Sequence, residues 1–156
     1  MTSIHYKDAD ALNALVSEEL GDWSSSITVD QAMISQFADL TGDHMWMHVD
    51  EERCAKESPF GCTIAHGFLI LSLQSKMTSS KSAIEDIEGY SHIMNYGSDK
   101  LRFLGAVPVN SELHSRSRVK AIAVSEHKTT LTLETHIHIV DQDKPGLIYE
   151  LMMVFL

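Results

Sequence analysis

Two segments decide how this sequence is interpreted: Thr41-Gly42-Asp43-His44-Met45-Trp46-Met47-His48 and Ile64-Ala65-His66-Gly67-Phe68-Leu69. The first places a carboxylate and an imidazole five residues apart, just after a Thr-Gly pair that is typical of a helix end. The second opens what we expect to be a buried helix, with His-Gly at its N-terminus. An acid/base pair beside a helix N-terminus suits chemistry in which negative charge develops on a carbonyl oxygen.

Length and charge limit the possible functions. The chain has 156 residues, of which 44% are hydrophobic, so we expect one domain over residues 1–156 that folds without a disulfide or a metal. Lys and Arg number 12 against 22 Asp and Glu, a net charge of −10 with His neutral. This charge argues against nucleic-acid binding, which needs a basic surface. An anionic ligand would need a local cluster of Lys and Arg.

The cysteines and the apolar segments predict where the protein resides. Cys54 and Cys62 could pair, but we interpret them as two reduced thiols. The first twenty residues resemble no signal peptide. The longest nearly apolar stretches, 63–73 and 147–156, are shorter than the roughly 20 residues that span a bilayer. We therefore expect a cytoplasmic protein with no membrane association.

Hydrophobic periodicity predicts an α+β fold. We expect a loose helix within residues 1–20, a strand at Ser25–Val29, and a helix that Asp30 caps and Gly42 ends. One or two helical turns at Asp50–Lys56 and an apolar helix that is covered on most sides should follow. Four strands complete the pattern, at Ile93–Phe103, Glu112–Val124, Thr129–Val140 and Leu147–Phe155. We expect a four-strand meander whose sheet wraps the apolar helix.

Three ordered motifs together carry a family resemblance. Residues 37–50 (Phe-Ala-Asp-Leu-Thr-Gly-Asp-His-Met-Trp-Met-His-Val-Asp) resemble the hydratase motif of MaoC-like (R)-specific enoyl-CoA hydratases. Residues 58–61, residues 63–69 and residues 95–103 look like other hallmark segments of the nodulation-protein-N-like branch. Met45 and Trp46 replace the Asn-Pro of the broader family, as that branch tends to do. The resemblance implies a hot-dog fold, in which an antiparallel sheet wraps a central helix.

The resemblance implies reversible hydration of trans-2-enoyl-CoA to (R)-3-hydroxyacyl-CoA. Asp43 and His48 would hold and activate one water molecule and manage both proton movements on one face of the double bond. The backbone N–H of Gly67 would stabilise the enolate-like thioester oxygen. No cofactor is implied, because coenzyme A is part of the substrate and the thioester itself makes the double bond electrophilic.

Further residues are candidates for substrate binding. We place His66 beside Gly67 in this group, with a ring satisfied by local hydrogen bonds rather than acting as a catalyst. The resemblance implies that the segment with Asn95, Tyr96, Lys100 and Arg102 borders the pocket and helps to bind the thioester or the CoA phosphates. An alternating basic set on a later strand is a weaker candidate for the phosphates; it consists of Arg116, Arg118 and Lys120.

Histidine spacing gives little support for a metal. His44 and His48 are four residues apart, but Met45-Trp46 stands where a metalloprotease-like motif needs its Glu, and no third ligand is evident. His136 and His138 share one face of a strand, and we interpret them as exposed polar residues. We therefore expect no metal.

The interpretation leaves two rivals open. One is a hot-dog acyl-CoA thioesterase, which would attack the carbonyl carbon. The other is a non-catalytic protein that binds acyl-CoA or an acyl carrier. The replacement of the family's Asn-Pro by Met45 and Trp46 would support this second rival. For the hydratase, the family resemblance implies a homodimer with two active sites near the interface, in which two sheets join edge to edge and remove an exposed strand edge.

Overall fold

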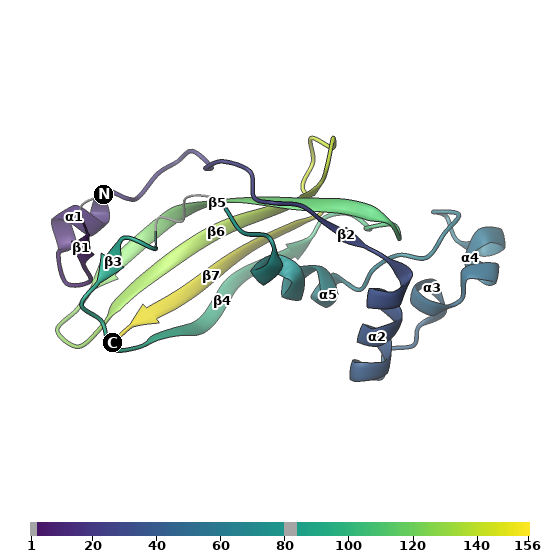
Figure 1. Ribbon diagram of the computed structural model, residues 1–156, viewed down its shortest axis with the longest axis horizontal. Coiled ribbons are helices and arrows are strands. Elements are labelled where there is room, and N and C mark those ends of the chain that lie inside the picture. Colours follow the sequence, from purple (N-terminus) through teal and green to yellow (C-terminus); the bar gives the residue numbers. More distant parts are fainter. Residues whose placement is uncertain (1–2, 80–83) are drawn as a thin grey trace.

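The computed structural model describes residues 3–79 and 84–156, and an antiparallel sheet organises most of them (Figure 1). The sheet has the strand order β2-β5-β6-β7-β4, and β1 pairs separately with β3. The described elements are β1 (Ile4–His5), α1 (Ala9–Asn13), β2 (Ile27–Val29), α2 (Gln31–Thr41), α3 (Trp46–Val49), α4 (Glu51–Glu57), α5 (Gly67–Ser72), the 3-10 helix η1 (Leu73–Lys76), β3 (Ile87–Glu88), β4 (Ile93–Phe103), β5 (Ser111–Val124), β6 (Thr129–Ile139) and β7 (Leu147–Phe155).

The four long strands lie where periodicity predicts them, but their connection differs. The ends of β4 and β7 are as predicted, and β5 and β6 each differ by one residue at one end. However, β4 pairs with β7 at the edge of the sheet and not with β5, so the predicted four-strand meander is wrong. Only β5, β6 and β7 form a meander.

Residues 104–110 carry the chain from β4 at one edge of the sheet to β5 near the other. On the way they run beside the segment that leads into α5. The N–H of Ala65 donates to the carbonyl of Val107 at 2.8 Å, and the N–H of Val109 donates to the carbonyl of Thr63 at 2.9 Å. This crossover segment therefore lies next to the N-terminus of α5.

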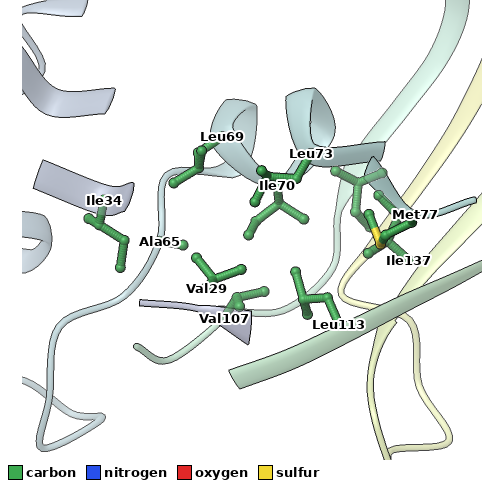
Figure 2. Packing of buried hydrophobic residues seen from close by; sticks show 11 residues of the cluster. Val29, Ile34, Ala65, Leu69, Ile70, Leu73, Met77, Val107, Leu113 and Ile137 are labelled. Carbon is green, nitrogen blue, oxygen red and sulfur yellow. The ribbon is translucent and has the colours of Figure 1, made fainter. Parts of the chain in front are cut away.

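The predicted apolar helix lies against one face of the sheet, called the inner face here (Figure 1). Figure 2 shows Ile70 projecting from the helix into the main core cluster. The buried members of this cluster are Val29, Ile34, Ala65, Leu69, Ile70, Leu73, Met77, Val107, Leu113, Ile137 and Leu147. Burial of so much apolar area, at roughly 25 cal/mol per Å², is what fixes the helix on the sheet.

The helix departs from its prediction on one side. Phe68, in its first turn, is 61% exposed, so the expectation that the helix is covered on most sides is wrong there. Phe68 is exposed because it lies at the edge of the sheet. Its ring packs edge-on against Phe103, at the end of the outermost strand β4. Among the described residues, no further strand pairs with the outer edge of β4.

Helices α2, α3 and α4 gather at one end of the sheet, next to α5 (Figure 1). As predicted, the Asp30 side chain caps α2 by accepting from the N–H of Met33 at 2.8 Å. Gly42 ends the helix with a φ of 79°, a left-handed conformation that glycine adopts without strain. The chain then turns into α3, which periodicity did not predict, and into α4, which the predicted turns at Asp50–Lys56 anticipate.

The N-terminal segment is less helical than its spacing predicts. Only α1 is helical, so the helix expected within residues 1–20 is wrong over most of its length. The chain instead follows the open side of β5, where the N–H groups of Ser17, Gly21 and Ser24 donate to carbonyls of that strand at 2.8–3.0 Å. Pairing with a strand edge satisfies these amides better than an isolated short helix would.

Trp23, in this N-terminal segment, covers part of the outer face of the sheet. Its ring stacks on His114 with centroids 3.8 Å apart and meets His138 edge-on at 5.0 Å. His138 is only 2% exposed and His136 is half-buried, so the prediction that both are exposed is wrong. Burial lowers the pKa of His114 and of His138 from its ordinary value.

A network of opposite charges occupies the middle of the outer face. The Glu134 carboxylate lies 3.2 Å from the Arg118 guanidinium and 3.2 Å from the Lys120 ammonium. Lys120 also lies 2.6 Å from the Glu150 carboxylate. Two members of the weaker candidate set for CoA phosphates are thus already paired with carboxylates of their own sheet.

Two further expectations concern the whole chain. Both Cys54 and Cys62 are free thiols, as predicted. Within residues 3–79 and 84–156, none of the helices combines the length and the apolar character that crossing a bilayer requires.

Candidate active site

Asp43, His48 and His66 converge at the N-terminus of α5. One nitrogen or carboxylate oxygen from each side chain lies within 4.8 Å of those from the other two. Asp43 comes from the turn between α2 and α3, His48 from α3, and His66 from the position just before α5. The two imidazoles are nearly inaccessible, at 7% and 4% exposure, whereas Asp43 is exposed. The residues predicted as an acid/base pair are therefore neighbours, and His66 joins them.

The His48 ring is held in one tautomer. Its Nδ1 lies 2.7 Å from the carbonyl oxygen of Ile64. A carbonyl can only accept, so Nδ1 carries the hydrogen and Nε2 keeps a free lone pair. The main chain of His48 is fixed as well, because the Gln31 side chain donates to its carbonyl at 2.8 Å and accepts from the Thr63 hydroxyl. The bonds to α2 and to the segment before α5 together set the orientation of this imidazole.

Gly67 is the first residue of α5, and helix geometry leaves its N–H without an acceptor inside the helix. A Cβ built at this position would lie 2.7 Å from two ring atoms of Phe103. The missing side chain thus makes room for the Phe103 ring of β4. His48 and Gly67 nevertheless border the same cavity.

This cavity has a volume of about 430 Å³. Apart from His48 and Gly67, its lining is mostly apolar and consists of Ile64, Ala65, Phe68, Ile70, Phe103, Leu104, Gly105, Ala106, Val107, Gly146 and Leu147. A ligand with a long apolar part and one polar group would suit such a lining. Sequence reasoning missed the crossover residues in this list. The small pair Gly105-Ala106 between two apolar residues is the signal that could have marked them.

The candidate binding residues of β4 lie elsewhere in this chain. In the register of the sheet, Lys100 is opposite Glu150 and Arg102 is opposite Ile148. Lys100 Nζ lies 3.4 Å from the Glu150 carboxylate of the outer-face network, which places Lys100 on the side away from the cavity. None of the four candidate residues of β4 lines the cavity.

Asn95 and Tyr96 lie near the other end of β4. Tyr96 precedes Phe103 by seven residues, which corresponds to about 20 Å along a strand. Its ring is instead next to Lys128, whose Nζ lies 5.2 Å from the ring centroid, in the turn between β5 and β6. Within one chain these two residues are therefore remote from Asp43 and His48.

The donor set of the cluster also bears on metal binding. One carboxylate and two imidazoles are ligand types that Zn²⁺ accepts. Each imidazole has one nitrogen bonded to a main-chain carbonyl, His48 to Ile64 and His66 to Asp43 at 2.9 Å. A ring held in this way through one nitrogen can use the other nitrogen either to accept a proton or to bind a metal. The expectation that the site works without a metal stays a prediction.

Comparison with known proteins identifies the family. Residues 17–141 match the family model described as MaoC like domain. The chain belongs to this family. The MaoC-like chain is 40% identical over 137 residues to nodulation protein N of Rhizobium meliloti, which covers 87% of this chain and 83% of that protein. It is 36% identical over 142 residues to 3-hydroxyacyl-thioester dehydratase Z of Mycobacterium tuberculosis, with 89% of each chain covered.

Solved structures agree with this MaoC-like assignment. The (R)-hydratase from A. caviae involved in PHA biosynthesis superposes with a TM-score of 0.67 at 25% identity, over 88% of this chain and 96% of that one. The predicted hot-dog fold is confirmed, and so is the resemblance to the branch of nodulation protein N. This MaoC-like protein is thus a member of a hydratase and dehydratase family.

Proposed function

We propose that this protein catalyses the reversible hydration of trans-2-enoyl-CoA to (R)-3-hydroxyacyl-CoA. The observation that carries the proposal is the convergence of the Asp43 carboxylate and the His48 ring beside an apolar cavity that the Gly67 amide also borders. The names of two relatives point the same way, because one is a 3-hydroxyacyl-thioester dehydratase and the other an (R)-hydratase.

In the proposed reaction, His48 and Asp43 bind one water molecule between them. The free lone pair of His48 Nε2 takes a proton from this water while the water oxygen bonds to C3 of the enoyl group. The electrons of the double bond move toward the thioester. C2 then takes from the side-chain pair the one proton that the water gave up, so that both side chains return to their starting protonation state. Two groups on one side of the substrate add both parts of water to one face. General acid/base groups of this kind contribute about 10²–10⁴-fold each.

The thioester oxygen gains negative charge when the water oxygen attacks C3. The N–H of Gly67, which lacks an acceptor within α5, would donate to this oxygen. With this donor and the acid/base pair, the chain's own groups supply every proton and charge interaction that the reaction needs. We therefore propose that neither a metal nor a redox cofactor takes part.

The proposal is tested with purified protein and crotonyl-CoA. Loss of the enone absorbance without release of a thiol is expected, and a dehydrogenase specific for (R)-3-hydroxyacyl-CoA should oxidise the product. Thiol release without loss of the enone would contradict hydration and favour a thioesterase. Saturable acyl-CoA binding without turnover over a range of chain lengths would contradict any enzymatic role. Prior dialysis against EDTA should leave the rate unchanged.

A further inference from the structure

We propose that His66 is a positioning residue that sets the geometry of both Asp43 and His48. The inference rests on the proposed hydratase function and goes beyond it, because the sequence indicates only a substrate-binding role for His66. The side chain is 4% exposed and lies among segments from α2, α3 and α5. It contacts each of the two other residues of the cluster directly.

The contact with Asp43 is a hydrogen bond to its main chain. His66 Nε2 lies 2.9 Å from the Asp43 carbonyl oxygen, so Nε2 carries the hydrogen and donates it. The bonds that Asp43 makes within its own turn are longer. Its N–H reaches the Thr41 hydroxyl at 3.4 Å, and its carboxylate accepts from the N–H of Met45 at 3.4 Å. The bond from His66 is therefore the best-formed of these three contacts on the residue that carries the carboxylate.

The contact with His48 is a ring stack. The two imidazole centroids are 3.7 Å apart and the planes are inclined by 26°. The Ile64 carbonyl fixes the edge of the His48 ring, and the His66 ring fixes its face. Together they restrict rotation of the His48 ring and so hold the direction in which Nε2 points.

His66 is itself held in place. The Phe37 ring packs at 5.0 Å from it, so His66 is the middle of three rings from three segments. Its Nδ1 is buried and, among the described residues, has no hydrogen-bond partner. The bond to Asp43 is thus the hydrogen bond by which the His66 side chain can position another residue of the cluster.

Two properties of the side chain can be separated by substitution. His66→Gln keeps an N–H donor near the position of Nε2 but loses the ring. His66→Phe keeps a flat ring against His48 but loses the donor, and His66→Leu loses both. His127→Leu is the matched control, because His127 is 87% exposed in the turn between β5 and β6.

The kinetic test compares these variants with crotonyl-CoA at a temperature where each is folded. A misplacement of about 1 Å at a reacting group can cost about 100-fold. We expect His66→Leu to lower kcat by 10- to 100-fold with KM changed by less than threefold. His66→Gln and His66→Phe should each recover part of this loss. A rise in KM with kcat unchanged would overturn the inference and assign His66 to substrate binding.

A second measurement does not depend on turnover. NMR of ¹⁵N-labelled protein should show the hydrogen of His66 on Nε2 in the wild type. In His66→Leu the Asp43 amide and the His48 ring signals should shift, while in His127→Leu they should not. A His66 hydrogen on Nδ1, or unchanged Asp43 and His48 signals, would overturn the inference. If these NMR results hold but the wild-type protein has no hydratase activity, the proposed function fails and the positioning contacts stand.

Discussion

Asp43 and His48 are held differently, and this predicts different costs of substitution. The Asp43 carboxylate is exposed and accepts one long hydrogen bond, whereas the His48 ring is buried, stacked and bonded to Ile64. We expect Asp43→Asn to leave the free energy of unfolding nearly unchanged. His48→Gln should lower it by about 1–2 kcal/mol, because a buried hydrogen bond and a ring contact are lost.

Both substitutions should nevertheless reduce hydratase activity by about 10²–10⁴-fold. The measurement is the initial rate with crotonyl-CoA, together with urea unfolding of each variant. His44→Gln is the matched control, since His44 is half-exposed and pairs with Asp39 outside the cluster. Wild-type turnover in either active-site variant would show that the assignment of that residue is wrong.

For single residues, the sequence predicts which side chains form the site better than it predicts the contacts between them. The motif around Asp43 and His48 was sufficient to select both, and the structure brings them together. The role of His66 was not predictable in the same way, because its bond to Asp43 joins two segments 23 residues apart. Which nitrogen of a ring is bonded depends on how those segments meet.

Among the elements, the outer-face network on β5, β6 and β7 predicts a stability that depends on pH. Burial of Glu134 opposes its ionisation, but hydrogen bonds from Arg118, Lys120 and His136 outweigh burial and lower its pKa to about 2. A carboxylate with a depressed pKa stabilises the folded state above its ordinary value of 4.5. This stabilisation, about 3 kcal/mol by the linkage relation, is lost as the pH falls from 4.5 through about 2.

Glu134→Gln should therefore destabilise the protein at pH 7 by about 3 kcal/mol, and the difference from wild type should shrink at pH 3. Urea unfolding at both pH values, at one protein concentration, measures this. Glu126→Gln is the control, since Glu126 is 88% exposed in the turn between β5 and β6. An equal difference at pH 7 and pH 3 would contradict the linkage.

Periodicity predicted the four long strands and α2, but it missed the short helix α3. Strands β4 and β7 have the ends that alternation and turn residues indicate, and Asp30 and Gly42 mark the ends of α2. Helix α3 has four residues, too few to show a helical period, although it carries His48. The burial of His138 was equally hidden, because Trp23, which covers it, is more than a hundred residues away in the sequence.

For the whole molecule, the outermost strand β4 is the feature with the clearest consequence. Nearly all of its residues are exposed, and several large apolar side chains lie on or beside it, namely Ile93, Met94, Tyr96, Phe103 and Leu104. An exposed edge strand of eleven residues offers unpaired N–H and carbonyl groups to another strand. We propose that two copies pair through β4, as expected from the sequence.

Antiparallel pairing of two β4 strands would also bring the partner's copy of the strand segment with Asn95 and Tyr96 toward Phe103 and the cavity. Sedimentation should accordingly give a mass of about twice 17.4 kDa. Met94→Lys, which places a charge on this edge, should yield a monomer with reduced activity, whereas Lys144→Met in the β6–β7 turn, at an exposed position, should remain a dimer. A monomeric wild-type protein with full activity would contradict the proposal.

The position of β4 also marks the limit of prediction at this scale. Its residues and ends could be predicted, but its neighbour could not. Alternation within a strand indicates which face is buried and carries no information about which strand lies beside it. The crossover through residues 104–110 decides the pairing, and this segment also lines the cavity.

The most direct test of the central claim is a crystal structure of Asp43→Asn with crotonyl-CoA bound. The thioester oxygen should lie 2.7–3.1 Å from the Gly67 nitrogen, the range expected for an oxyanion donor. A water molecule between residue 43 and His48 Nε2 should lie about 3–3.5 Å from C3 of the enoyl group. A thioester bound with its oxygen away from Gly67, or with C3 out of reach of both side chains, would contradict the account.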